Sequence, residues 1–268
     1  MNTTTKLLVI GSVALAQSAA TVTSNGQTWQ DEYTVRVYEA PSGERMGYRL
    51  LTPKPLTAGK KYPVVLFFHG AGERGDDNLK QLIHCAGQFA TPANRAQYPA
   101  YVIVPQCPLN QQWVNMPWGA DVGVRPAEPS DAMRLALAIL GSVEQEYAAD
   151  IDLNRIYVSG ISMGGYGTWD CVTRYPARFA AAVPICGGGD ETTVTAEVAK
   201  LPVWAFHAAD DGAVKVNRTR NMIAAMQAAG GTPKYTEYPA EQKVGHGSWG
   251  PAYRDPELFP WLFSQVRK

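Results

Sequence analysis

Hydrophobic and polar positions along the chain form two kinds of segment. Short apolar runs bounded by turn residues occur at 63–68 and 101–104. Uninterrupted runs of this length are typical of strands that are covered on both faces. Residues 130–147 instead repeat apolar side chains every three or four positions behind Ser130, which indicates a helix with one buried face and a serine N-cap.

The whole pattern predicts strands and helices in alternation. Strands are expected at residues 33–38, 46–51, 63–68, 101–104, 155–159, 179–185, 202–206 and 234–238, and helices at 78–90, 130–147, 163–174, 216–229 and 257–266. The first two strands flank a Pro-Ser-Gly turn and are expected to form a hairpin. This alternation is typical of a doubly wound, mostly parallel α/β sheet of about eight strands with helices on both faces. The longest insertions, 105–129 and 187–200, are too short for a large cap domain.

The first twenty residues have the pattern of a secretory signal peptide. Lys6 precedes an apolar, small-residue stretch at 7–20 that ends in small residues suited to cleavage. The sequence therefore predicts a signal peptide at 1–20, a single catalytic domain at 21–268 and a secreted or periplasmic protein, with an N-terminal helix as the alternative. The stretch is shorter than the roughly 20 residues that cross a bilayer, so no stable membrane anchor is expected.

Composition narrows the classes of partner. Among 268 residues, 24 basic and 24 acidic side chains cancel, and no run of Lys or Arg occurs. Nucleic acid is therefore not an expected partner. The four cysteines show no C-x-x-C spacing, so no zinc site is expected. They are interpreted as small buried hydrophobes, with one disulfide as the alternative: Cys85, Cys107, Cys171 and Cys186.

The segment 160–164 has the pattern G-x-S-x-G and is placed between a predicted strand and a predicted helix. That context is typical of a nucleophile elbow, in which a sharp turn exposes the hydroxyl of Ser162 and only glycine at 160 and 164 lets the backbone approach. The alternative is a glycine-rich turn with a capping serine.

A serine nucleophile needs a base held by an acid. Of the four histidines, only His246, in a glycine-flanked loop after the last predicted strand, follows the order serine, acid, histidine of this fold. Asp210 and Asp211 both lie just past a strand end, and spacing alone does not rank them. One of the two is expected to serve as a turn or capping residue.

Ester attack also needs two donors for the negative oxygen that forms. One is the backbone N–H of Met163, which follows the nucleophile. The other is expected from the glycine-rich loop 69–75 after the third predicted strand. A phosphate-binding loop is the competing interpretation, but the segment lacks a Walker lysine-serine ending.

Four segments together resemble the α/β-hydrolase superfamily, and within it single-domain esterases that are carboxylesterase/phospholipase-like, polyhydroxybutyrate depolymerase-like or feruloyl esterase-like. They are Phe68-His69-Gly70-Ala71-Gly72-Glu73-Arg74-Gly75, Pro105-Gln106-Cys107-Pro108 with Trp113, 160–169, and Pro184-Ile185-Cys186-Gly187-Gly188-Gly189. The resemblance implies Asp211 as the acid and Ala71, or alternatively Gly72, as the second oxyanion donor. Gly212 stands where such esterases usually have proline.

The resemblance implies a serine carboxylic ester hydrolase that acts through an acyl-enzyme and needs no cofactor or metal. A prolyl-oligopeptidase-like peptidase and a dienelactone-type hydrolase are the alternatives. Trp113, Trp118 and Trp249 lie in loops at the expected strand ends and are predicted to line the cleft, with loop packing as the alternative. Flat aromatic walls favour small-molecule or polymer esters with short-chain or aryl (feruloyl-type) acyl groups over long-chain lipids.

Overall fold

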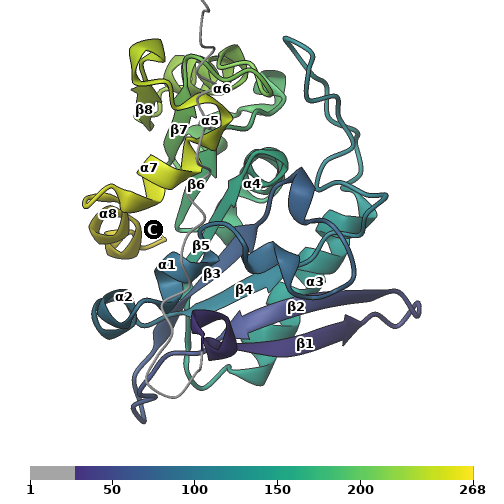
Figure 1. Cartoon of the computed structure of the whole chain (residues 1–268), viewed down its shortest axis with the longest axis vertical. Coiled ribbons are helices and arrows are strands. Elements are labelled where there is room, and N and C mark those ends of the chain that lie inside the picture. Colours follow the sequence, from purple (N-terminus) through teal and green to yellow (C-terminus); the bar gives the residue numbers. More distant parts are fainter. Residues whose placement is uncertain (1–27, 268) are drawn as a thin grey trace, which may run out of the picture.

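Eight strands form one sheet in the computed structural model, which describes residues 28–267 (Figure 1). Their order across the sheet is β1-β2-β4-β3-β5-β6-β7-β8. β1 pairs with β2 and β2 with β4 in antiparallel fashion, and all other pairs are parallel. The strands are β1 Tyr33–Glu39, β2 Arg45–Leu51, β3 Tyr62–Phe68, β4 Tyr101–Pro105, β5 Ile151–Ile161, β6 Ala181–Ile185, β7 Trp204–Ala208 and β8 Lys234–Tyr238.

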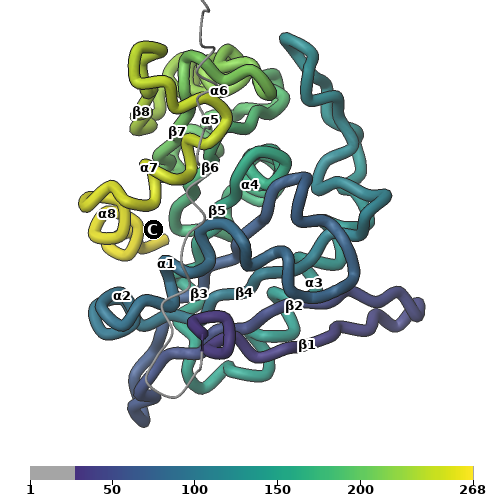
Figure 2. Tube along the Cα trace, viewed as in Figure 1, coloured from purple at the N-terminus to yellow at the C-terminus, as the bar shows by residue number. Residues whose placement is uncertain are grey.

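Helices cover both faces of the sheet (Figure 2). Alternate residues of β3 explain why, since Leu66 packs into the core shared with α3, α4 and α6, whereas Phe67 packs into the core shared with α1, α7 and α8. The doubly wound, mostly parallel architecture predicted from the sequence is thus confirmed. The helices are α1 Ala86–Ala90, α2 Pro92–Gln97, α3 Asp131–Glu146, α4 Met163–Arg174, α5 Ala196–Ala199, α6 Asn217–Ala228, α7 Trp249–Arg254 and α8 Leu258–Ser264.

Local details follow the sequence pattern closely in most elements. The β1–β2 hairpin forms, and the side chain of Ser130 accepts a hydrogen bond from Met133 N–H and caps α3 as predicted. Gly230 follows the C-terminal cap of α6 and has a φ of +87°, a conformation that ends the helix. The observed end lies within one residue of the predicted one. β5 extends further than predicted in both directions, over Ile151–Ile161.

The prediction of one continuous helix at residues 78–90 is wrong. The chain forms a 3₁₀ turn at Lys80–Leu82 and then the separate helix α1, because Asn78 and Cys85 have φ values of +52° and +65°. A residue with left-handed φ cannot continue a right-handed helix. The short helices α2 and α7 were not predicted, and each carries a proline in its first turn, where a missing N–H costs no helical hydrogen bond.

The arrangement of strands brings distant segments to one edge of the sheet. β3, β5, β6, β7 and β8 run parallel, so the segments that follow their carboxyl ends meet there. These segments are the ones that carry the predicted nucleophile, acid, base and oxyanion loop.

Two further expectations concern export and the cysteines. The predicted signal peptide lies outside the described residues, so export stays a prediction. Within residues 28–267, no helix is long and apolar enough to cross a membrane. All four cysteines are free in the structure. Cys107, Cys171 and Cys186 are buried, as their interpretation as small hydrophobes predicted, whereas Cys85 is only partly buried.

Candidate active site

Ser162 occupies a sharp turn between β5 and α4. Its φ of +52° and ψ of −117° lie outside the regions that most residues adopt, and this strain turns the side chain away from the sheet. The flanking glycines are required by close backbone contacts. A Cβ at Gly160 would lie 2.3 Å from the carbonyl oxygen of Gly164, and a Cβ at Gly164 would lie 2.1 Å from that of Phe68. The strand–turn–helix setting predicted for Ser162 is therefore present.

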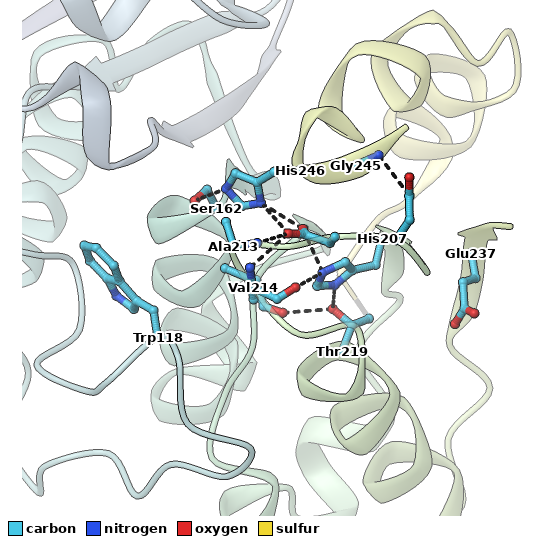
Figure 3. A network of polar contacts seen from close by, with 12 residues as sticks. Trp118, Ser162, His207, Ala213, Val214, Thr219, Glu237, Gly245 and His246 are labelled. Atoms are coloured by element: carbon cyan, nitrogen blue, oxygen red, sulfur yellow. Dashed lines mark hydrogen bonds and ion pairs between the residues drawn. The ribbon is translucent and has the colours of Figure 1, made fainter. Parts of the chain in front are cut away.

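Ser162, His246 and Asp211 form one hydrogen-bonded chain (Figure 3). His246 lies in a 3₁₀ turn after β8, and its Nε2 is 2.8 Å from Ser162 Oγ. Its Nδ1 is 2.8 Å from Asp211 Oδ2 and 3.0 Å from Oδ1. Because a carboxylate only accepts, Nδ1 carries the proton and leaves Nε2 free to accept the proton of the serine hydroxyl.

The environment of Asp211 keeps it ionised. Its side chain is fully buried, and its Oδ1 accepts hydrogen bonds from the backbone N–H groups of Ala213 (2.8 Å) and Val214 (2.9 Å). Burial raises the pKa of this carboxyl, but hydrogen bonds from His207, His246 and the two amides outweigh that effect and hold its pKa below the usual range. A charged, fixed acceptor is what an imidazole base needs behind it.

Asp210 has a different partner. Its Oδ1 accepts a hydrogen bond from the N–H of Gly245 at 2.9 Å, next to His246 in the chain. Both carboxylates thus accept hydrogen bonds from backbone amides, but Asp211 also contacts the imidazole, whereas Asp210 holds the loop that carries it. The turn role expected for one of the pair belongs to Asp211, whose Oδ1 accepts hydrogen bonds from the backbone amides two and three residues ahead, so the acid and the turn residue are the same side chain.

Both predicted oxyanion donors are the first residues of helical segments. Met163 begins α4, and Ala71 begins the 3₁₀ turn Ala71–Glu73. N–H groups in a first turn have no acceptor within their own helix, which leaves these amides free for a ligand. The loop lies against the nucleophile, since a Cβ at Gly70 would be 3.6 Å from the Cβ of Ser162. Arg74 braces the loop, because its Nε donates to the carbonyl of Ala71 at 2.9 Å.

His69 fixes the start of the same loop. Its Nε2 accepts a hydrogen bond from Cys107 N–H at 2.9 Å, so its Nδ1 carries the proton and donates to the carbonyl of Gly70 at 2.6 Å. Burial lowers the pKa of His69 to about 4, against an ordinary value of about 6.5. The neutral ring is therefore part of the folded loop.

This pKa predicts acid sensitivity of the fold. The unfolded chain binds a proton at His69 as pH falls below about 6.5, whereas the folded chain resists protonation until about 4, so the contribution of His69 to stability is lost across that window. We expect the free energy of unfolding to fall by about 3 kcal/mol more in the wild type than in His69→Gln between these pH values. Urea unfolding at a series of pH values measures this difference, and equal pH dependence in both proteins contradicts the assignment.

The three predicted tryptophans have different places. Trp113 is fully buried, packs on Phe68 with ring centroids 4.7 Å apart and donates to the carbonyl of His69 at 3.1 Å. Its prediction as a substrate-lining residue is therefore wrong, because its large apolar ring is used to pack the long loop onto the core.

Trp118 and Trp249 are half-buried and lie near the candidate site. The Trp249 ring meets His246 edge to face, with centroids 5.4 Å apart. The Trp118 ring lies 5.8 Å from the guanidinium of Arg74, the side chain that braces the oxyanion loop, and Figure 3 shows Trp118 on the Ser162 side of the network.

Sequence reasoning missed the groups behind Asp211. His207 contacts Asp211 Oδ2 at 3.1 Å through its Nε2 and Thr219 Oγ1 at 2.8 Å through its Nδ1. A polar side chain inside an otherwise apolar strand, four residues before the acid, was the available signal.

Within residues 28–267, one group of three side chains brings ligand atoms suited to a metal close together, and two of its members, Asp211 and His246, belong to the hydrogen-bonded network. Atoms of Cys186, Asp211 and His246 lie within 4.8 Å of one another. Burial raises the pKa of the Cys186 thiol to about 12, so the sulfur keeps its proton, whereas metal ligation requires the thiolate. Asp211 and His246 use their ligand atoms on each other and on Ser162, which is the arrangement that a serine nucleophile requires.

Similarity to known proteins agrees with this geometry. Residues 57–252 match the phospholipase/carboxylesterase family. A rice protein (Oryza sativa subsp. japonica) named as a probable carboxylesterase is 24% identical over 204 residues, covering 71% of this chain and 84% of the relative. The crystal structure of a thermostable esterase is 39% identical with a TM-score of 0.81, covering 89% of this chain and 64% of that esterase, so this chain spans less than two thirds of its length.

A structure of a ferulic acid esterase shares the fold, with 16% identity and a TM-score of 0.57 over 86% of this chain and 97% of that protein. The matched family spans most of the sheet and all of the segments that carry Ser162, Asp211 and His246. The chain belongs to the phospholipase/carboxylesterase family of α/β-hydrolases and is a hydrolase of that family.

Proposed function

We propose that this protein hydrolyses short-chain, aryl (feruloyl-type) or polymer-attached carboxylic esters, through an acyl-enzyme on Ser162. The observation that carries the proposal is the continuous hydrogen-bonded chain from Ser162 Oγ through His246 to a buried, ionised Asp211. A serine hydroxyl is a weak nucleophile at neutral pH, and this arrangement is the one that activates it.

In the first half-reaction, Ser162 Oγ attacks the ester carbonyl carbon while its proton moves to His246 Nε2. Asp211 stabilises the imidazolium that forms, and the amides of Ala71 and Met163 donate to the negative carbonyl oxygen. The tetrahedral intermediate then breaks its bond to the alcohol oxygen, which takes the proton from His246. Water, activated by the same imidazole, releases the acid from Ser162 in the second half-reaction.

The preference for flat or short acyl groups rests on Trp118 and Trp249. Each is half-buried, and each contacts a group that the mechanism uses: Trp249 the base, and Trp118 the arginine that braces Ala71. A rigid ring wall makes good contact with an aryl group or a sugar ring and gains less from a flexible chain, which loses rotational freedom on binding.

The substrate proposal predicts a selective effect of removing the rings. Trp118→Ala and Trp249→Ala are expected to lower kcat/KM for a feruloyl ester more than for an acetate ester of the same alcohol. The ratio of the two kcat/KM values, feruloyl over acetate, is expected to fall by about tenfold, because only the aryl acyl group contacts the rings. Steady-state kinetics on the two esters measures the ratio. Trp→Phe at each position keeps a ring and serves as the matched control.

A panel of nitrophenyl esters of increasing acyl length, with a feruloyl ester, an acetylated sugar and a peptide nitroanilide, tests the proposal as a whole. We expect turnover of the acetyl, butyryl and feruloyl esters. A clear preference for acyl chains above about ten carbons contradicts the substrate class. Faster cleavage of the nitroanilide than of every ester would instead identify a peptidase.

A further inference from the structure

A second imidazole lies directly behind Asp211, on the side away from His246. His207 is at the end of β7 (Figure 3), and the side chains of His207 and Asp211 are both fully buried. Burial of a polar ring among apolar strands is costly unless its nitrogens have partners. Both nitrogens of His207 have them, and they lead from Asp211 to α6.

The partners determine which nitrogen carries a proton. Nε2 lies 3.1 Å from Asp211 Oδ2 and 3.0 Å from the carbonyl oxygen of Val214, and both atoms only accept. Nε2 is therefore a donor. Nδ1 lies 2.8 Å from Thr219 Oγ1, which is also 2.9 Å from the carbonyl oxygen of Gly187. Whichever neighbour receives the threonine proton, Nε2 keeps its own.

We propose that His207 is a positioning residue for Asp211, held in register by the hydroxyl of Thr219; this inference rests on the proposed function. Two backbone amides hold Oδ1, whereas Oδ2 has only imidazoles, His246 on one side and His207 on the other. His207 keeps Oδ2 from rotating away from His246 and supplies a donor that keeps the carboxylate ionised. Its contact with the Val214 carbonyl also fixes the turn that provides the two amides.

His207 does not act on substrate itself. Its ring is fully buried, and Asp211 separates it from His246 and Ser162. Its effect must therefore appear in the turnover step, where the imidazolium of His246 needs a fixed counter-charge, and not in the binding of the ester.

The experiment compares His207→Phe, which keeps a ring and removes both nitrogens, with His207→Gln, whose amide N–H can reach Asp211. On a nitrophenyl ester we expect His207→Phe to lower kcat by about 10- to 100-fold, the usual effect of losing a hydrogen bond to a charged group. KM is expected to stay within about twofold, because ground-state binding is unchanged. His207→Gln is expected to recover most of the lost kcat.

A matched pair of variants tests the contact between Thr219 and His207. Thr219→Val keeps the shape of the side chain and removes the hydroxyl, whereas Thr219→Ser keeps the hydroxyl, so the valine variant is expected to lose more kcat than the serine variant. This pair and His207→Gln carry the test if His207→Phe does not fold, as judged by its thermal melting curve.

The outcomes separate this inference from the proposed function. If His207→Phe or Thr219→Val folds and retains wild-type kcat while Ser162→Ala is inactive, the role of His207 is wrong and the esterase proposal stands. Equal losses in Phe and Gln, or a loss expressed in KM, assign His207 to packing and also overturn the inference. If the wild type hydrolyses no ester, or Ser162→Ala keeps its activity, it is the proposed function that fails.

Discussion

Replacing Ser162 with alanine is expected to lower kcat/KM for a nitrophenyl ester by about 10⁴-fold or more, because the variant lacks the oxygen that attacks the carbonyl. The oxygen lies 2.8 Å from His246 Nε2, the position from which its proton can leave. His246→Ala is expected to lose a similar amount. The double variant is expected to be no worse than either single one, since the two side chains act as a unit.

The fold is expected to survive this change. Alanine removes one atom from a half-buried side chain, and the strained backbone at this position is present in both proteins. Circular dichroism and the melting temperature serve as controls. Retention of activity within about tenfold of the wild type would contradict the mechanism.

The second large effect is expected at the acid. Asp211→Asn should reduce kcat by about 10³- to 10⁴-fold, because an amide is uncharged and its NH₂ group cannot accept the Nδ1 proton of His246. Asp210→Asn is the matched control, since its amide oxygen can still accept the hydrogen bond from Gly245 N–H. That variant is expected to lose about tenfold or less.

Steady-state kinetics on the two asparagine variants checks this order. A larger loss in Asp210→Asn would transfer the role of the acid to Asp210 and would require a rearranged loop, because its carboxylate bonds to Gly245 in the structure. Comparable losses in both variants would indicate that the 210–211 pair acts by holding the loop alone.

The sequence contains enough to predict the sheet and the relation of Ser162 to His246. Continuous apolar runs identify the covered strands, and the glycines at 160 and 164 mark a turn so tight that a Cβ meets backbone at under 2.5 Å. The chain order of serine, acid and histidine then leaves only His246 after the last strand. These features are local, so a single sequence displays them.

Other features depend on contacts that no local pattern records. The choice between Asp210 and Asp211 depends on which carboxylate the turn aims at His246, and the turn is fixed by contacts of Val214 and His207. The burial of Trp113 depends on how the long loop packs on Phe68. The break in the predicted helix 78–90 depends on Cys85, a non-glycine residue with left-handed φ that no propensity favours.

An acyl-enzyme mechanism requires a covalent bond between Ser162 and the acyl group of the substrate. A phosphonate ester phosphonylates activated serines and arrests the enzyme at that step, so peptide mass mapping after reaction with it identifies the nucleophile. We expect one adduct per chain on the peptide that contains Ser162, loss of esterase activity in proportion to labelling, and no adduct in Ser162→Ala. An adduct on another residue, or full ester hydrolysis by a chain that carries the adduct, would contradict it.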